Sequence, residues 1–296
     1  MMRSSSVRSW LNSAELAEGA VMTQNLLFCG HIGDIAAVSF DMSENSDPAS
    51  PPNASPPNAS PLNASPQNAS PPDVTPPDAS PPDSAASTVR REAHLATYSR
   101  DSIYQVLDAG YLAHVGIIAA DGRPTVIPTL FGRDGEVLYL HGSVASRLVR
   151  TLAAGVDCSV EVTIVDGLVL ARSAFLHSMN YRSVVIFGRA RRVEDSEQLH
   201  ALKVISDHLL PGRWEESRQP SETELRQTCV LALSMEEASA KIRTGGPTEE
   251  EPEDIALPIW AGELPIDTSW GAPIPASDLA GGIAESAAVQ AGLRRR

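Results

Sequence analysis

The chain has 296 residues and a formal net charge of -14. Nucleic acid and anionic membrane surfaces would repel so acidic a protein, so neither is expected as a partner. Its three cysteines are far apart and show no CxxC spacing, which argues against a disulfide framework and a zinc site and fits a cytoplasmic protein. The apolar run at 21–40 is interrupted by Gln24 and Asp34, so we read no membrane anchor and no export signal in it.

A pentapeptide repeat separates the start of the chain from the rest. Between Pro51 and Ser84 the units are Pro-Pro-Asn-Ala-Ser and close variants of it. Paired prolines remove backbone donors and almost nothing here is apolar enough to bury, so 42–89 is predicted to be a disordered linker. Residues 1–41 form an uncertain N-terminal extension, and one alternative is that translation starts at Met42.

From residue 90 onward the pattern becomes that of a folded domain. A helix is predicted over 102–109, where Ile103, Val106 and Leu107 share one face. Three strands follow, separated by Asp-Gly turns, which is the pattern of an antiparallel meander. Their predicted ranges are 112–119, 125–131 and 137–141.

The remaining elements complete a mainly β pattern with short helices. In chain order they are a helix at 143–154, strands at 158–165 and 181–193, a helix at 196–210, a helical turn near Thr223 and a strand from Thr228 to Met235 that extends in one interpretation to Ile242. The absence of βαβ alternation predicts a six-stranded antiparallel β-barrel of the Greek-key type over 90–245, either closed or split, and not a Rossmann sheet. Residues 246–296 are predicted to form an extension that packs on the barrel and ends in a disordered tail.

One stretch, 139–147, has the pattern of an anion site. A strand there runs into a serine-flanked turn and then into a helix, whose first backbone N–H groups point outward. Ser143, Ser146 and Arg147 add hydroxyl donors and a cation at that end, as a terminal phosphate requires. In the alternative interpretation Ser143 only caps the helix and Arg147 is a solvated surface charge, and the segment alone leaves both open.

Several motifs together resemble one known family. They are IPT at 127–129, RDG at 133–135, LYLHGS at 138–143, ASR at 145–147, VDGLVLARSA at 165–174, HSMNYRSVV at 177–185 and IWAGELP at 259–265. In this order and spacing they look like the pyridoxamine 5'-phosphate oxidase-related, flavin-nucleotide-binding family, and more closely like its nitroimidazole-resistance-type branch. The resemblance covers roughly 90–279.

The resemblance implies an FMN-binding split barrel that works as a homodimer, with FMN in the cleft between the subunits. It places the phosphate on Ser143, Ser146 and Arg147, with His141 and Gly142 lining the approach. The remaining implied contacts come from backbone groups of Val126, Ile127, Pro128 and Thr129 at the ring edge, and from Asn180, Tyr181, Arg182 and Ser183 on the other side of the cleft. Each polar residue of the second set also has a plain structural interpretation, as a turn residue, a barrel-face aromatic or a surface cation.

The histidines leave further alternatives. His177 either faces the flavin, serves as an axial haem ligand as in haem-handling relatives of the fold, or satisfies a loop carbonyl. No metal is assigned, because the remaining histidines of the domain have no acidic or cysteine partners at metal-ligand spacing. These are His94, His114, His200 and His208.

The function implied is that of an FMN-dependent oxidoreductase. Flavin N5 would pass hydride to a small organic acceptor such as a nitroaromatic or a quinone, with a reduced nicotinamide as donor and no catalytic side chain assigned. The alternative is a non-catalytic protein that binds or senses flavin or haem. Vitamin B6 synthesis is not expected, because the family's basic substrate motif is missing and 249–254 is acidic.

Overall fold

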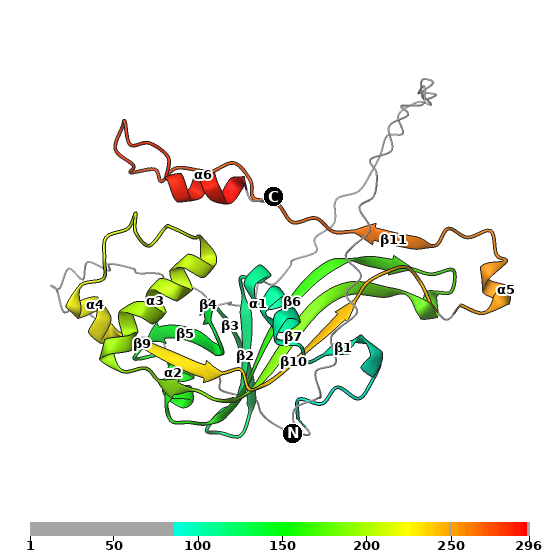
Figure 1. Ribbon diagram of the computed structural model, residues 1–296, viewed down its shortest axis with the longest axis horizontal. Coiled ribbons are helices and arrows are strands. Elements are labelled where there is room, and N and C mark those ends of the chain that lie inside the picture. Colours follow the sequence, from blue (N-terminus) through cyan, green and yellow to red (C-terminus); the bar gives the residue numbers. More distant parts are fainter. Residues whose placement is uncertain (1–85, 249, 295–296) are drawn as a thin grey trace, which may run out of the picture. The chain divides into compact units, whose positions relative to one another are not determined.

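The computed structural model describes residues 86–248 and 250–294 (Figure 1). The predicted extension at 1–41 and most of the predicted linker at 42–89 lie outside the described residues. Among the described residues, no helix is long and apolar enough to cross a membrane.

The larger sheet contains seven strands, and every pairing in it is antiparallel. Six of them lie in the order β1, β10, β7, β6, β2, β3, and β11 pairs with β6 beside that path. Their bounds are β1 Ala96–Thr97, β2 Ala113–Ile118, β3 Pro124–Thr129, β6 Asp157–Leu170, β7 Ser178–Arg189, β10 Glu237–Arg243 and β11 Gly262–Pro265. The β6–β7 hairpin is the longest pairing and contains a register shift between Val165 and Gly167.

The smaller sheet has four antiparallel strands in the order β4, β5, β9, β8. Their bounds are β4 Phe131–Asp134, β5 Val137–Ser143, β8 Arg191–Arg192 and β9 Thr228–Ser234. The main core fills the space between the sheets, with Val115 and Val160 from the first and Leu138 and Leu231 from the second all fully buried or nearly so.

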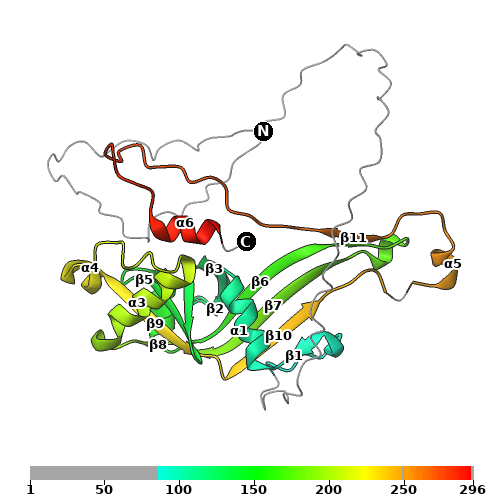
Figure 2. The ribbon, with the colours of Figure 1, turned by 45° about the horizontal axis from the view of Figure 1, so that its top comes forward.

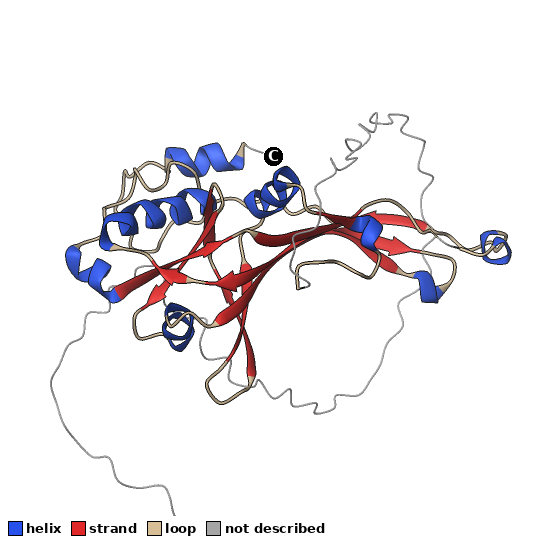
Figure 3. Ribbon diagram, turned by 60° about the horizontal axis from the view of Figure 1, so that its bottom comes forward, coloured by secondary structure: helices blue, strands red, loops and turns tan. Residues whose placement is uncertain are grey.

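Six α-helices and two 3₁₀ turns surround these strands (Figure 3). They are η1 Ala93–Leu95, α1 Arg100–Ala109, α2 Arg147–Ala153, η2 Ala174–Leu176, α3 Asp195–Leu209, α4 Glu222–Gln227, α5 Pro252–Ile255 and α6 Ala287–Leu293. Helix α1 buries Ile103, Val106 and Leu107 in the main core, as its periodicity predicts. Helix α3 packs so closely on β4 that a Cβ added at Gly132 would lie 2.7 Å from the Cα of Ile205.

The mainly β, antiparallel prediction is confirmed, but the count of six strands is wrong. The predicted strand at 125–131 is two strands, β3 and β4, which belong to different sheets. Similarly, the predicted strand at 181–193 divides into β7, which begins at Ser178, and the short β8. Both breaks are places where the chain passes from one sheet to the other, and a local pattern does not record that change.

The second helix also begins later than predicted. Ser143 pairs with Thr228 and therefore remains in β5, so α2 begins only at Arg147. At the other end of the chain, the expectation of a disordered tail differs from the structure, in which 287–293 forms α6. The Ser286 side chain caps this helix by accepting a hydrogen bond from the Val289 N–H at 3.2 Å.

Candidate cofactor site

The end of β5 and the start of α2 place two hydroxyl groups side by side in one turn. Ser143 Oγ accepts a hydrogen bond from the Ala145 N–H at 3.2 Å, and Ser146 Oγ accepts one from the Val149 N–H at 3.5 Å. Both oxygens therefore act as acceptors, which leaves each hydroxyl hydrogen free to be donated to a ligand. Gly142 lets the helix approach, because a Cβ there would lie 2.7 Å from Val149 Cγ2.

Arg147 is exposed and makes no hydrogen bond or ion pair with any residue that the structure describes. Its positive charge nevertheless affects the pKa of a carboxyl group in the β2–β3 turn. The pKa of the Asp121 carboxyl lies below its ordinary value, first because Arg123 hydrogen-bonds to it and to a smaller extent because of Arg147.

Two further arginines extend this positive charge. Arg150 lies three residues after Arg147, so both project from the outer face of α2. Arg192 of β8 pairs with Leu231, a residue of the main core, and so points to the side of the small sheet that α2 covers. Its charge also opposes the rise in the pKa of the Cys229 thiol that burial causes.

Arg147, Arg150 and Arg192 are called the arginine patch below, although Arg192 lies on the face of the small sheet opposite to that of His141 and Ser143. Within the described part of the chain none of the three has a hydrogen-bonded or ion-paired partner, whereas most of the other arginines do. Sequence reasoning missed two members. The spacing of Arg147 and Arg150 on a predicted helix was a usable signal for the first, but Arg192 reaches the site only through sheet pairing.

Strand β3, which carries 126–129, is the edge of the larger sheet. Its residue Ile127 packs against the main core, while Val126 is 65% exposed. One end of β3 follows the turn that contains Asp121, and the other leads to Phe131, which pairs with Leu140 beside His141. The chain thus runs from the predicted ring-edge residues on β3 through Phe131 into the small sheet that carries the predicted phosphate residues.

His141 of β5 has an unusual buried nitrogen and lies on the face of the small sheet that α3 covers. Its Nδ1 is buried and has no hydrogen-bond partner among the described residues. Burial lowers the pKa of the imidazole, which favours the neutral ring. Because strand side chains alternate, His141 shares its face of β5 with Tyr139 and Ser143. A buried polar atom without a partner is uncommon in proteins, so this nitrogen fits a site that a further group completes.

The second predicted set, Asn180 to Ser183, is not brought to this surface. It lies on β7, three strands from β3 in the sheet order, or about 14 Å at the usual strand spacing. Ser183 Oγ donates to the Lys241 carbonyl at 3.3 Å, and the Tyr181 hydroxyl makes no hydrogen bond within the described residues.

The polar groups of Asn180 and Arg182 are used within the chain itself. Buried Asn180 accepts a hydrogen bond from Arg243 and donates one to Glu263, each at 2.6 Å. Arg182 donates to both carboxylate oxygens of Asp166, at 2.8 and 2.7 Å, which raises the pKa of Arg182. Both side chains therefore stabilise the β6–β7 hairpin and its neighbours.

Two histidines have acidic partners, which contradicts the expectation that they had none. His114 Nδ1 lies 3.3 Å from Glu161 Oε2, and His200 Nε2 lies 2.8 Å from Asp134 Oδ2. His114 and Glu161 are direct neighbours in the β2–β6 pairing, a relationship invisible to sequence spacing. His177 is bound within its own loop, but to an amide and not to a carbonyl, since its Nδ1 accepts a hydrogen bond from the Ala171 N–H at 3.1 Å.

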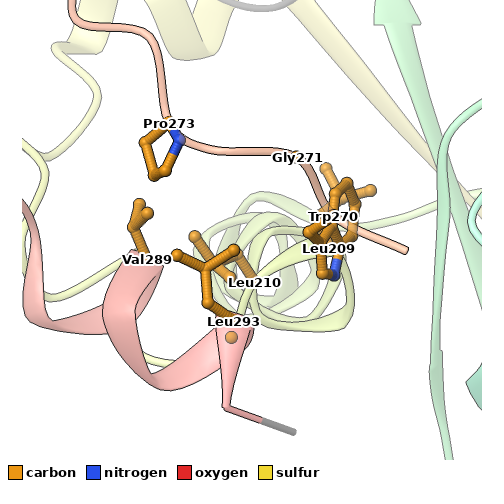
Figure 4. Close-up of a pocket in the computed structure, with 8 residues that line it drawn as sticks. Leu209, Leu210, Trp270, Gly271, Pro273, Val289 and Leu293 are labelled. Carbon is orange, nitrogen blue, oxygen red and sulfur yellow. The ribbon is translucent and has the colours of Figure 1, made fainter. Parts of the chain in front are cut away.

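A shallow, open apolar pocket lies between the end of α3, the segment 270–273 and α6 (Figure 4). It has a volume of about 240 Å³ and is lined by Leu209, Leu210, Trp270, Gly271, Pro273, Val289, Gly292 and Leu293. This is smaller than the roughly 300–1,000 Å³ of most small-molecule sites, and it offers almost no polar group. The predicted cofactor residues instead form an open surface.

Comparisons with known proteins identify the family and the fold. The family described as pyridoxamine 5'-phosphate oxidase matches residues 99–242. The flavocytochrome Anf3 from Azotobacter vinelandii is 37% identical, with a TM-score of 0.68, over 72% of this chain and 99% of that protein. The FAD and haem binding protein from Mycobacterium smegmatis is 38% identical, with a TM-score of 0.64, over 67% of this chain and 97% of that protein.

A putative 5-nitroimidazole antibiotic resistance protein from Bacteroides thetaiotaomicron is 23% identical, with a TM-score of 0.41, over 50% of this chain and 86% of that protein. No curated protein sequence matches the chain. The matched range spans both sheets, and the resemblance seen in the sequence is confirmed at the level of the family and of its split-barrel fold. The chain therefore belongs to the pyridoxamine 5'-phosphate oxidase-like family.

Proposed function

We propose that this chain binds a flavin nucleotide, FAD in preference to FMN, on the surface formed by β3, the end of β5 and the start of α2. The observation that carries the proposal is the arginine patch, three cations without acidic partners in a protein of net charge -14. The expectation of FMN depended on the family resemblance and on a phosphate site of Ser143, Ser146 and Arg147, which has one cation and suits a single terminal phosphate. Three arginines suit the two phosphates of FAD better.

The relatives support the same choice. The Mycobacterium smegmatis protein is described as binding FAD and haem, and the Azotobacter vinelandii protein is described as a flavocytochrome. A bound flavin supplies hydride and single-electron transfer. The residues of this chain would hold its phosphates through the patch and through Ser143 and Ser146, while β3 lies along the ring.

We further propose that a second copy of the chain completes the cleft. Asn180 to Ser183 are too far from β3 to contact the same ligand within one protomer, and the surface near the patch is open. A homodimer would bring a second wall to that surface, as the family resemblance implies. The second copy would complete the cleft whichever flavin it holds.

Haem binding is the second candidate function, and one observation favours it. The carboxylate of Glu161 beside His114 Nδ1 favours a proton on that nitrogen, which leaves the Nε2 lone pair available to a metal. Nε2 of His114 has no partner among the described residues. His177 has the opposite arrangement, because its Nδ1 already accepts a hydrogen bond. We therefore assign the axial position to His114.

Together these proposals favour a flavin and haem protein over a nitroaromatic or quinone reductase. Membership of the nitroimidazole-resistance-type branch, and use of a reduced nicotinamide, remain predictions. Purification of the full chain, extraction of its cofactors and identification by mass test the proposal directly. Recovery of FAD supports it, while a protein that takes up neither flavin contradicts it. Anaerobic addition of a reduced nicotinamide then distinguishes an enzyme from a binding protein, because only an enzyme would bleach the flavin.

A further inference from the structure

We propose that the C-terminal arm, defined as residues 255–283, clasps a second copy of this chain. The arm carries ten of the nineteen exposed large apolar side chains of the described residues. They are Ile255, Leu257, Ile259, Trp260, Leu264, Ile266, Trp270, Ile274, Leu279 and Ile283. Ile274 is 93% exposed and presents nearly its whole side chain to solvent, while Trp260 is 66% exposed.

The arm is nevertheless held in place on its own chain (Figure 2). Its strand β11 pairs with β6 from Gly262 to Pro265, and Glu263 accepts the hydrogen bond from buried Asn180. Farther along, the Trp270 and Tyr111 rings meet edge to face at 5.3 Å. After the arm, α6 docks through Glu216, which accepts a hydrogen bond from the Ala288 N–H at 3.0 Å. The arm is thus bound to its own chain through β11 and Trp270, while its apolar side chains remain exposed to solvent.

The exposed area is that of a protein interface. At roughly half of a side-chain area of about 150–200 Å², the ten side chains present on the order of 800–1,000 Å². A typical monomer has a largest apolar patch of about 300–600 Å². One partner in a standard stable interface contributes about 800 Å². A partner of protein size therefore fits the arm better than a small ligand.

The charge of the arm restricts the partner. It contains Glu263, Asp267 and Asp278 but no lysine or arginine, so anionic lipid and nucleic acid would be repelled. The partner must offer an apolar surface of its own.

This chain offers such a surface on the outer face of its larger sheet. Pairing places Val126, Gly116, Ser159 and Phe187 in one row across four strands, with two small residues between two apolar ones. Ile118 of β2 lies on the same face and is exposed. A reciprocal exchange, each arm lying on the other copy's sheet, is the isologous arrangement that homodimers most often use.

The inference rests on the homodimer in the proposed function, and its docking face shares Val126 with the proposed flavin surface. Its test is sedimentation velocity of the full chain over a concentration series, with the Ile274→Glu variant and Leu199→Glu as the matched control. Leu199 is an exposed leucine on α3, outside the arm. The wild type and L199E should sediment as dimers. The dimer dissociation constant of I274E should be at least ~10-fold higher than theirs.

Ile274 makes so little contact within its own chain that I274E should keep the thermal unfolding midpoint of the wild type. A wild type that stays monomeric throughout the series would overturn the inference, as would an I274E variant that dissociates no more readily than L199E. Flavin content of the same samples separates the two proposals. A dimer that lacks flavin overturns the proposed function alone, whereas flavin retained by a monomer overturns the clasp.

A photo-crosslinking amino acid at position 274 identifies what the arm touches. In a mixture of isotopically light and heavy chains, crosslinks between light and heavy chains that end on the outer face of the larger sheet support a second copy. Crosslinks confined to single chains, including those to the first 85 residues, would overturn it.

Discussion

The guanidinium of Arg182 donates two hydrogen bonds to the carboxylate of Asp166, at 2.8 and 2.7 Å, inside the β6–β7 hairpin. Both groups are about one-third exposed, so the pair is partly screened by water. The pair holds the Arg182 guanidinium within its own hairpin, whereas Arg147, Arg150 and Arg192 have no ion-paired partner among the described residues. Phosphate binding is therefore expected at the arginine patch.

The first prediction concerns the patch. Arg147→Gln, Arg150→Gln and Arg192→Gln should each weaken FAD binding, because each removes a charge-assisted contact worth about 1.5–3 kcal/mol, or roughly 10- to 150-fold. Riboflavin binding should not change, since riboflavin has no phosphate. Fluorescence titration with both ligands measures this. Arg189→Gln is the control, because Arg189 is exposed but ion-paired with Asp157. Equal weakening of FAD and riboflavin would refute the assignment.

The second prediction concerns haem. His114→Ala should abolish the Soret band of haem-loaded protein, because the proposed axial ligand is lost. His177→Ala should retain it. Glu161→Gln should keep haem bound but weaken it by about 10- to 100-fold, because the carboxylate only orients the ring. Haem titration followed by absorbance measures all three. Loss of the band in H177A with retention in H114A would reverse the assignment.

The third prediction concerns the buried amide of Asn180. Asn180→Ala should lower the free energy of unfolding by about 1–3 kcal/mol, because it leaves Glu263 and one hydrogen bond of Arg243 without this partner. The midpoint of urea unfolding measures the change. Tyr181→Phe is the neighbouring control, since the Tyr181 hydroxyl makes no hydrogen bond within the described residues. N180A with the stability of Y181F would show that the network contributes nothing.

The sequence predicted those parts of the fold that depend on interactions between residues close together in the chain. Helix α1 and the β2–β3 hairpin were predicted because periodicity and an Asp121-Gly122 turn act within a few residues. The end of β5 was misplaced because Ser143 is held by its pairing with Thr228, far along the chain. A serine before a helix predicts the start of that helix, but pairing with a distant strand extends β5 through Ser143.

The same distinction applies to the site. Ser143, Ser146 and Arg147 are neighbours in the chain, so their convergence was predictable. Arg192 and the pairing of His114 with Glu161 depend on sheet register, which sequence spacing does not contain. The intrachain contacts of the second family motif depend on register in the same way, since Asp166 and Glu263 bind its polar groups.

The fourth prediction concerns pH. Burial lowers the pKa of His141 and of His208 below the ordinary value of 6.5. A group whose pKa is lowered in the folded state stabilises it above the unfolded pKa, and that stability is lost as the pH falls. The free energy of unfolding should therefore decrease as the pH falls below about 6.5. Urea unfolding of wild type and His141→Gln across this range should show a smaller decrease in the variant. An identical decrease would contradict a buried neutral His141.

The most direct test of the central claim is a paired titration of the purified, cofactor-free full chain with FAD and with FMN at one ionic strength. If the arginine patch holds two phosphates, FAD should bind at least ~10-fold more tightly than FMN, because the additional phosphate gains contacts of its own. Equal affinity for the two flavins, or tighter binding of FMN, would contradict the account.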